Sequence, residues 1–516
     1  MSRCPSPVST GVCAFAAVLF IASAAHSQIA VTTWHYDNTR SGANTNETTL
    51  TPRNVKAKAF GKLFEQPVDG AIIGQPLYLP NVAFQGAGSH NVVYAATMHD
   101  SVYAFDADNA NGPNADPLWH VSFLSPGVTP VPVAVQGCGT VTKWTEVGVL
   151  STPVIDATSG TLYVVAKTYK NGTHMHQLHA LDISTGNEKP GSPVTITASY
   201  QSGAKKYLFR DAMQVNRPAL MLQNGYVYVA FGSNGCRSSK EEGWVVAYKA
   251  DTLQAAGVFD TEPGASAAGI WLRGGGLSAD SDGNVYGETA DGPYKDGVNF
   301  GLSVFKLAQT QSALALADWF TPYDLVFLDK KDQDLNEPVL ILPDQPGPYP
   351  HLAIAVGKEG TLYVLNRDDM GHQCETCKLG DTQIVQEMPL VVGPDTGALI
   401  YWNNIVYTSG DASPVSAFAL AGGLLAGVPF AESSRGAGQH SPVLSANGNT
   451  SGIVWQINGS ILTAYDALTL ERLYTSSQDK TGRDQLPELP HFANLMVANG
   501  KVYVGTNTSL AFYGLF

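Results

Sequence analysis

The chain repeats one short pattern in which two apolar runs flank a polar turn. In residues 91–109, "NVVYAATMHDSVYAFDADN", each run alternates large apolar side chains with small or polar ones. This alternation is typical of half-buried β-strands, because successive side chains of a strand point to opposite faces. The pattern recurs in "GTLYVVAKT", "GYVYVAFGS" and five later places, ending with "GKVYVGTNT" before "LAFYGLF", and a further apolar run such as "QPLYLP" or "SPVLSA" precedes each pair. We therefore predict an all-β chain of eight similar units.

Repeated units of this kind predict a β-propeller, a ring of four-stranded sheets called blades. A single blade cannot bury both of its faces, whereas a closed ring of blades can. The last unit ends at Phe516 without an outer strand, while "FGKLFEQPV", residues 60–68, adds a strand ahead of the first unit. We predict that this N-terminal strand completes the eighth blade, so that no edge is exposed. The expected organisation is a lead segment at 28–59 and a single propeller at 60–516.

The N-terminus resembles an export signal. Arg3 precedes the apolar stretch "GVCAFAAVLFIASAA", and the small residues Ala25 and Ser27 fit a cleavage site. We expect residues 1–27 to be a signal peptide and the mature protein to be exported, either periplasmic or secreted. No later segment approaches the roughly 20 apolar residues of a spanning helix, so no membrane span is expected.

The charge of the chain bears on its partners. The formal net charge is −14, and so acidic a chain would be repelled by nucleic-acid phosphates. We therefore expect no nucleic-acid partner. The expected ligand is instead a small molecule, a glycan or a protein bound at the axial face of the ring, and the protein is expected to be a monomer.

Four of the six cysteines lie beyond the predicted signal peptide. An even number in an oxidising compartment favours disulfides. We expect a local disulfide between Cys374 and Cys377, and Lys378 in place of a histidine argues against covalent haem. A second disulfide, between Cys138 and Cys236 of different blades, is left open, because sequence does not give their separation.

Several segments resemble the pyrroloquinoline quinone (PQQ) dehydrogenases, which are eight-bladed propellers. "AFDADNANGPNADPLW" and "ALDISTG" resemble their A-x-D-x-x-T-G-x-x-x-W repeat, and "GKEGTLYVLNRDDMG" (357–371) and "DQDLNEPVLI" (332–341) resemble two further segments. "WHYDNTRSGANTNETTLTP" (34–52) resembles the lead of exported PQQ-like propellers that have no assigned activity. The resemblance implies possible PQQ and calcium at the axis, with a carboxylate that takes the proton of an alcohol.

The resemblance also implies roles for particular residues. Lys358 in "GKEG" matches the basic residue that contacts the quinone oxygens, and Asp291 in "TADGP" matches a calcium ligand. Val298 in "DGVN" stands where the family has its catalytic aspartate, and valine can neither take a proton nor bind calcium. Asp296 could replace that aspartate only if the loop is realigned.

Other polar residues are expected at the axis because of their place in the repeat. Arg217, His440 and His491 each precede the first strand of a unit, and these ends lie near the propeller axis. We predict that they line a shared axial pocket with Lys358 and Trp271. The alternative is that they only cap loops.

Three functions follow from these observations. The first is an exported PQQ-like propeller that binds a ligand or partner without quinone redox chemistry, which Val298 favours. The second is a PQQ- and calcium-dependent dehydrogenase of an alcohol or sugar, and the third is an envelope assembly scaffold. Whether the protein is an enzyme stays open, since fold does not determine function.

Overall fold

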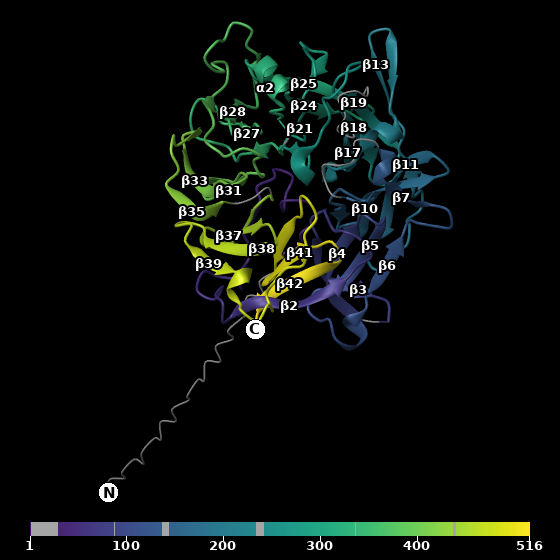
Figure 1. Ribbon diagram of the computed structural model, residues 1–516, viewed down its shortest axis with the longest axis vertical. Helices are drawn as coiled ribbons and strands as arrows, with labels where there is room; N and C mark the ends of the chain where they lie inside the picture. The colour runs from purple at the N-terminus through teal and green to yellow at the C-terminus, as the bar shows by residue number, and fades with distance from the viewer. Residues whose placement is uncertain (2–28, 87, 137–143, 234–241, 336, 437–439) are drawn as a thin grey trace.

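The computed structural model describes the chain except for residues 2–28, 87, 137–143, 234–241, 336 and 437–439. The predicted signal peptide and the cysteines Cys138 and Cys236 lie outside the described residues. Eight sheets are arranged in a ring, which confirms the predicted eight-bladed, all-β propeller (Figure 1). In the part of the chain that is described, no helix is long and apolar enough to cross a membrane.

Each blade is an antiparallel meander that runs from an innermost strand at the axis to an outer strand. The strands of the first four blades are, in blade 1, β3 (Leu77–Phe84), β4 (Gly88–Thr97), β5 (Ser101–Asp106) and β6 (Trp119–Ser122); in blade 2, β9 (Val154–Asp156), β10 (Thr161–Lys170), β11 (Thr173–Asp182) and β12 (Val194–Thr195); in blade 3, β16 (Met221–Gln223), β17 (Tyr226–Ser233), β18 (Trp244–Lys249) and β19 (Ala255–Asp260); in blade 4, β20 (Ser278–Ala279), β21 (Val285–Glu288), β24 (Val304–Gln309) and β25 (Leu314–Thr321).

The second half of the ring follows the same order. Its strands are, in blade 5, β26 (Leu340–Ile341), β27 (Leu352–Val356), β28 (Leu362–Asn366) and β30 (Gln386–Met388); in blade 6, β31 (Ile400–Trp402), β32 (Ile405–Thr408), β33 (Pro414–Ala421), β34 (Leu424–Leu425) and β35 (Ala431–Gly436); in blade 7, β36 (Val443–Asn447), β37 (Thr450–Asn458), β38 (Ile461–Asp466) and β39 (Arg472–Thr475); in blade 8, β40 (Leu495–Ala498), β41 (Lys501–Gly505), β42 (Ser509–Leu515) and β2 (Phe60–Pro67).

Short elements decorate the blades. They are β1 (Ala43–Asn44), β7 (Thr129–Pro132), β8 (Glu146–Val147), the hairpin β13 (Ser199–Ser202) and β14 (Lys205–Leu208), β15 (Gln214–Val215), the hairpin β22 (Tyr294–Lys295) and β23 (Asn299–Phe300), β29 (His372–Gln373), the helices α1 (Val133–Gln136) and α2 (Leu325–Lys331), and the 3₁₀ turns η1 (Gly112–Ala115), η2 (Asp211–Met213), η3 (Leu272–Gly274) and η4 (Ser476–Gln478).

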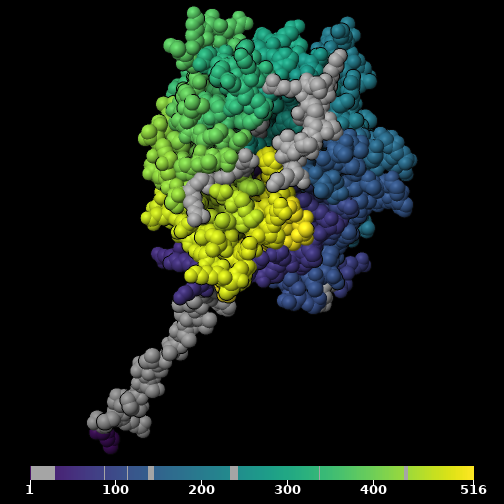
Figure 2. All heavy atoms as spheres, viewed as in Figure 1, coloured from purple at the N-terminus to yellow at the C-terminus, as the bar shows by residue number. Residues whose placement is uncertain are grey.

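The N-terminal strand closes the ring, as predicted. Strand β2 pairs antiparallel with β42 from Phe60 opposite Leu515 to Pro67 opposite Ser509. The first and last parts of the chain therefore share blade 8, and purple and yellow segments meet there in Figures 1 and 2. This pairing satisfies the backbone groups that an open outer edge would expose.

The hydrophobic core is divided among the contacts between neighbouring blades. One cluster joins Leu77 of blade 1 to Leu162 of blade 2, and another joins Met496 of blade 8 to Tyr78 of blade 1. Small residues at the middle of the third strands are buried in such contacts, as Ala104 shows. Each blade thus buries its faces only against its neighbours, which is why the repeat needs a closed ring.

Part of the lead segment lies inside the ring. Residues 31–44, here called the axial segment, contact the innermost strand of all eight blades, and purple chain is visible in the middle of the ring in Figure 1. The residues contacted, from blade 1 to blade 8, are Tyr78, Ile155, Leu222, Ala279, Ile341, Tyr401, Leu444 and Val497. The inner edge of each innermost strand has backbone N–H and C=O groups that its own blade does not use. The axial segment circles the axis and forms hydrogen bonds with these groups, which also satisfies its own backbone.

Two large side chains of the axial segment are completely enclosed. Trp34 is 0% exposed and Arg40 is 1% exposed. The Arg40 guanidinium donates from Nε to the Leu277 carbonyl oxygen at 2.8 Å and from Nη1 to the Trp34 carbonyl oxygen at 2.7 Å. The middle of the ring is therefore packed protein at these residues, and a ligand at the axis would rest on this segment.

Candidate axial binding site

The predicted site residues belong to loops at one face of the ring. Strand direction alternates within a blade, so the connection to the next blade and the hairpin between the second and third strands emerge at the same face. Arg217, Trp271, His440 and His491 lie in connections between blades, and Lys358 lies in the hairpin between β27 and β28. We call this face the axial face.

Arg217 is a buried cation on the axial face, and the described residues do not use all of its hydrogen-bonding groups. Its side chain is enclosed, with the residue only 7% exposed, and its guanidinium carbon lies 3.7 Å from the centre of the Phe492 ring and 5.8 Å from that of Trp271. No described residue accepts a hydrogen bond from its Nε or Nη2. Burial, and then repulsion from Arg273, lower the pKa of Arg217 to about 9, so it stays positively charged at neutral pH. An unsatisfied buried cation is costly, and this is a strong reason to look for an anionic ligand.

Arg273, the second arginine, has its partners within the protein. It contacts Glu337 Oε1 from Nε at 2.6 Å and forms an ion pair with Asp395 from Nη2. Leu272 and Arg273 both have left-handed backbone conformations, with φ of 45° and 42°. Such conformations are strained for residues with a side chain, and the Arg273 guanidinium carbon lies 5.9 Å from the centre of the Phe492 ring.

The predicted histidines lie at the same place. His491 stacks on Phe492 with 3.7 Å between ring centres, and the His440 Nδ1 donates to the Ala493 carbonyl oxygen at 3.1 Å. Burial and the nearby charge of Arg217 lower the pKa of His491 to about 4, and burial lowers the pKa of His440. Both rings are therefore neutral at neutral pH, and the charge of this cluster comes from its arginines and carboxylates.

Lys358 lies in a second, acidic part of the face. Its Nζ is 3.0 Å from Asp332 Oδ2 and 3.9 Å from Asp334 Oδ2. Burial alone would lower the pKa of Lys358, but Asp334 and Asp332 outweigh it and raise the pKa. The Asp395 backbone N–H donates to the Lys358 carbonyl oxygen at 2.8 Å, so the loop that pairs with Arg273 also joins the two parts.

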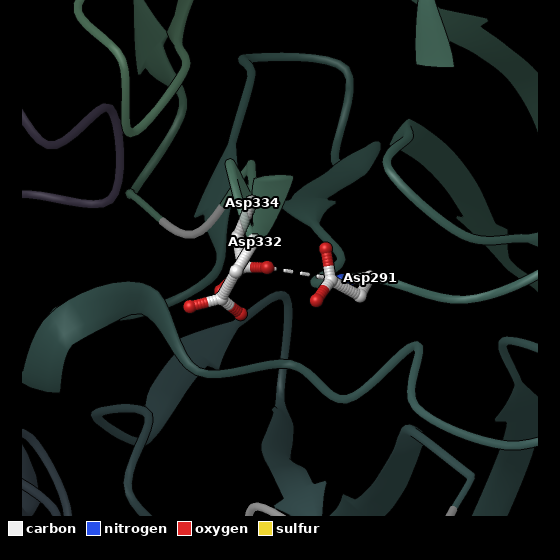
Figure 3. Close-up of side chains that lie close together, drawn as sticks. All are labelled: Asp291, Asp332 and Asp334. Carbon is white, nitrogen blue, oxygen red and sulfur yellow. Dashed lines mark hydrogen bonds between the residues drawn. The ribbon is translucent and has the colours of Figure 1, made fainter. Parts of the chain in front are cut away.

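Asp291 completes a group of three aspartates. Asp332 and Asp334 lie together and Asp291 approaches them from the other side (Figure 3), with carboxylate oxygens of the three within 4.8 Å of one another. The Asp291 backbone N–H donates to Asp334 Oδ1 at 3.3 Å. Carboxylate oxygens suit calcium, so these residues could hold a metal ion. The ammonium group of Lys358 already neutralises part of the charge of Asp332 and Asp334, and a metal ion would neutralise the rest.

The remaining predicted residue, Asp296, forms no hydrogen bond or ion pair with the arginine cluster or the three aspartates in the described part of the chain. Asp296 is exposed in the turn of the β22–β23 hairpin, where it accepts a hydrogen bond from the Tyr294 hydroxyl at 3.0 Å. Among the described residues, no contact joins Asp296 to Lys358 or to the three aspartates. Val298 is half-buried in the same hairpin and adds no carboxylate.

The cysteine prediction is confirmed where the chain is described. Cys374 and Cys377 form a disulfide, with 5.4 Å between their Cα atoms. The second possible disulfide, between Cys138 and Cys236, lies outside the described residues.

Sequence reasoning missed the base of the site. The Trp34 Nε1 donates to Asn494 Oδ1 at 3.0 Å, and the Asn494 side chain donates to the Phe492 carbonyl oxygen at 3.1 Å. Trp34 also packs against Ala219 and Ala398, which follow Arg217 and Asp395 closely in the chain. The sequence offered one indication: Trp34 is an isolated tryptophan in a polar segment. A large apolar side chain of this kind is usually buried in the fold.

Comparisons with known proteins agree with this architecture. No family model matches the chain, and no curated protein matches it in sequence. A quinohemoprotein alcohol dehydrogenase from Comamonas testosteroni superposes with a TM-score of 0.61 at 14% identity, covering 96% of this chain and 81% of that one. The alcohol dehydrogenase ADHIIG of Pseudomonas putida HK5 gives 0.58 at 13% identity, covering 94% and 80%, and a europium-containing methanol dehydrogenase gives 0.57 at 13%, covering 94% and 98%. The chain has the fold of these PQQ-dehydrogenase-like propellers.

At 13–14% identity the superpositions show a shared fold and leave the chemistry to the residues of this chain. The chemistry of this chain therefore depends on Arg217, Lys358 and their surroundings.

Proposed function

We propose that the protein is a binding protein that holds a small anionic ligand at its axial face and performs no quinone redox chemistry. The observation that carries the proposal is Arg217, an enclosed guanidinium with two nitrogen atoms that lack acceptors among the described residues. A carboxylate, phosphate or sulfate group matches the fork of a guanidinium and can accept two hydrogen bonds from it.

The surroundings of Arg217 also favour an anion that carries an apolar or aromatic body. Phe492 and Trp271 lie beside the guanidinium, so a planar ligand could bind its charge at Arg217 and stack on a ring. Arg273 adds positive charge at the same place, although Glu337 and Asp395 neutralise much of it. Because the net positive charge of this cluster is small, a ligand with one or two acidic groups fits it better than a polyanion.

The test is a titration of the full mature protein with benzoate, phthalate, phosphate and sulfate, followed by calorimetry and by thermal unfolding. We expect at least one carboxylate to bind and to stabilise the protein, and Arg217→Ala to abolish that effect. Arg483→Ala is the matched control, since Arg483 also lies over a phenylalanine ring, Phe516 at 4.1 Å, but is exposed and paired with Asp484. Absence of binding by every anion, or binding that survives Arg217→Ala, would refute the proposal.

A second function is favoured by the acidic part of the face. Asp291, Asp332 and Asp334 could hold calcium, and Lys358 could contact the oxygens of PQQ, which accepts two electrons from an alcohol when bound. The shared fold supports this alternative, a PQQ-dependent alcohol or sugar dehydrogenase, while Val298 in place of an acid counts against it. Titration with PQQ and Ca²⁺, together with a test for alcohol-dependent dye reduction, distinguishes the dehydrogenase from the anion-binding protein. Reduction that is lost in Lys358→Ala would establish the enzyme.

We further propose export of the protein as a monomer, based on the apolar N-terminal stretch and the disulfide between Cys374 and Cys377. Cell fractionation with N-terminal sequencing of the mature chain tests the export, and a new N-terminus near residue 28 is expected. Light scattering of the purified protein tests the monomer.

A further inference from the structure

A cavity of about 220 Å³ lies between blades 5 and 6, and Arg217 does not line it. It is formed by the connection that follows β30 and by the hairpin between β32 and β33, with one residue of β35. Both loops emerge at the axial face. The lining residues are Leu390, Val391, Val392, Gly393, Thr408, Ser413, Pro414, Ser416 and Glu432.

Hydroxyl groups and one carboxylate supply the polar lining. Thr408 is 1% exposed, and its Oγ1 has no hydrogen-bond partner among the described residues. The Ser416 hydroxyl donates to Glu432 Oε1 at 3.2 Å, and the Ser413 hydroxyl makes only a long contact of 3.4 Å with the Asp411 carbonyl oxygen. The cavity therefore offers donors and acceptors that the protein itself uses only in part.

Close backbone packing holds the walls in place. A methyl group on Gly393 would lie 1.5 Å from the Ser413 Oγ, and one on Gly410 would lie 2.5 Å from the Gly393 carbonyl oxygen. The Val392 backbone N–H donates to the Gly360 carbonyl oxygen at 3.0 Å, which fixes the same loop to the Lys358 hairpin. The backbone is thus tightly packed at Gly393 and Gly410, while Leu390 and Glu432 at the rim of the cavity are exposed to solvent.

We propose that this cavity binds a neutral polyhydroxylated molecule of monosaccharide size or smaller. Paired hydroxyls of such a molecule can donate to Glu432 and Thr408 and accept from the serines, while its C–H groups pack on Val391 and Val392. The volume excludes drug-sized ligands, whose pockets occupy roughly 300–1,000 Å³. Glu432 disfavours anions, and a single carboxylate gives a divalent cation too few charged ligands.

Isosteric variants test this site. We expect glucose or glycerol, added to the full protein at up to about 100 mM, to bind in ligand-detected NMR and calorimetry, since a small site allows only weak affinity. Thr408→Val removes one hydroxyl at equal volume and should weaken binding about three- to ten-fold, as should Glu432→Gln. Thr396→Val is the matched control, because Thr396 is also fully buried with a partnerless hydroxyl in the described structure but does not line the cavity.

The outcomes separate this site from the axial one. Binding that is unchanged in Arg217→Ala but weakened in Thr408→Val supports the proposal. Absence of any polyol binding, or equal binding in Thr408→Val and Thr396→Val, would overturn it. Because the proposal does not depend on anion binding at Arg217, either site can fail without affecting the other.

Discussion

Arg217 and Lys358 lie on the same face of the ring, yet their surroundings differ. Lys358 contacts two aspartates, whereas Nε and Nη2 of Arg217 have no hydrogen-bond acceptor among the described residues. Lys358 therefore has carboxylates in direct contact, whereas Glu337, the acid whose charge acts on Arg217, is in direct contact with Arg273 instead. The difference indicates where a ligand is needed: a charge that is already neutralised needs no partner, while a buried charge without one does.

The strongest test of this comparison removes a carboxylate beside the arginines. Glu337→Ala leaves Arg273 with Asp395 alone and increases the positive charge around Arg217. We expect the free energy of unfolding to fall by about 3–5 kcal/mol, as is common when one partner of a buried ion pair is removed. Urea unfolding of the variant measures it. A loss below about 1 kcal/mol would mean that the cluster is well hydrated.

The next test replaces the unpartnered cation. Arg217→Met keeps the apolar contact with Phe492 and removes a buried charge, so the ligand-free protein should gain about 1–2 kcal/mol of stability. Anion binding should be lost in the same variant. Thermal unfolding with and without ligand checks both effects, and destabilisation of the ligand-free protein would contradict the interpretation of Arg217 as a residue kept for binding.

The pH dependence sharpens the comparison further. The pKa of His491 is lowered to about 4 from 6.5 by burial and by the charge of Arg217, so the unfolded chain binds a proton before the folded one does. Stability should therefore fall as the pH decreases from about 6.5 to about 4, with a contribution of about 1 kcal/mol after allowance for solvent screening.

His491→Gln should remove this part of the slope when unfolding is measured across that range of pH. His351→Gln, at an exposed histidine next to Asp368, is the control. Equal slopes in the two variants would count against a neutral His491 in the folded protein.

The smallest effect is expected at the paired cation. Asp332→Asn removes the nearer partner of Lys358, but Asp332 is 70% exposed in its side chain and Asp334 remains. The free energy of unfolding should change by about 0.5 kcal/mol or less, as measured by urea unfolding. A change as large as that in Glu337→Ala would mean that the two cations are equally dependent on their partners.

Much of the architecture could be predicted because it depends on local patterns. The alternation in residues 91–109 is a property of neighbouring side chains, and β4 and β5 form there. The missing outer strand of the last unit also predicted that residues 60–68 would close the ring, and β2 does so. The disulfide of Cys374 and Cys377 was predictable because the two residues are three positions apart.

The candidate site was predictable only in part. The position of Arg217, His440 and His491 in the repeat placed them near the axis, but position does not reveal whether a charge has a partner. Arg273 was missed because its place depends on a left-handed backbone at η3, and no sequence pattern announces that conformation for leucine and arginine.

The amino-acid sequence thus specifies the strands, their number and the closure of the ring, since hydrophobic alternation acts over a few neighbouring residues. Tertiary structure alone decides that the axial segment circles the inside of the ring, that Trp34 lies under the site, and that Asp291 meets Asp332 and Asp334. These contacts join segments that are not neighbours in the chain, so they form only when the blades and their loops have packed together. The sequence gives the positive charge of Arg217, but only the folded ring shows that two of its nitrogen atoms have no hydrogen-bond acceptor among the described residues.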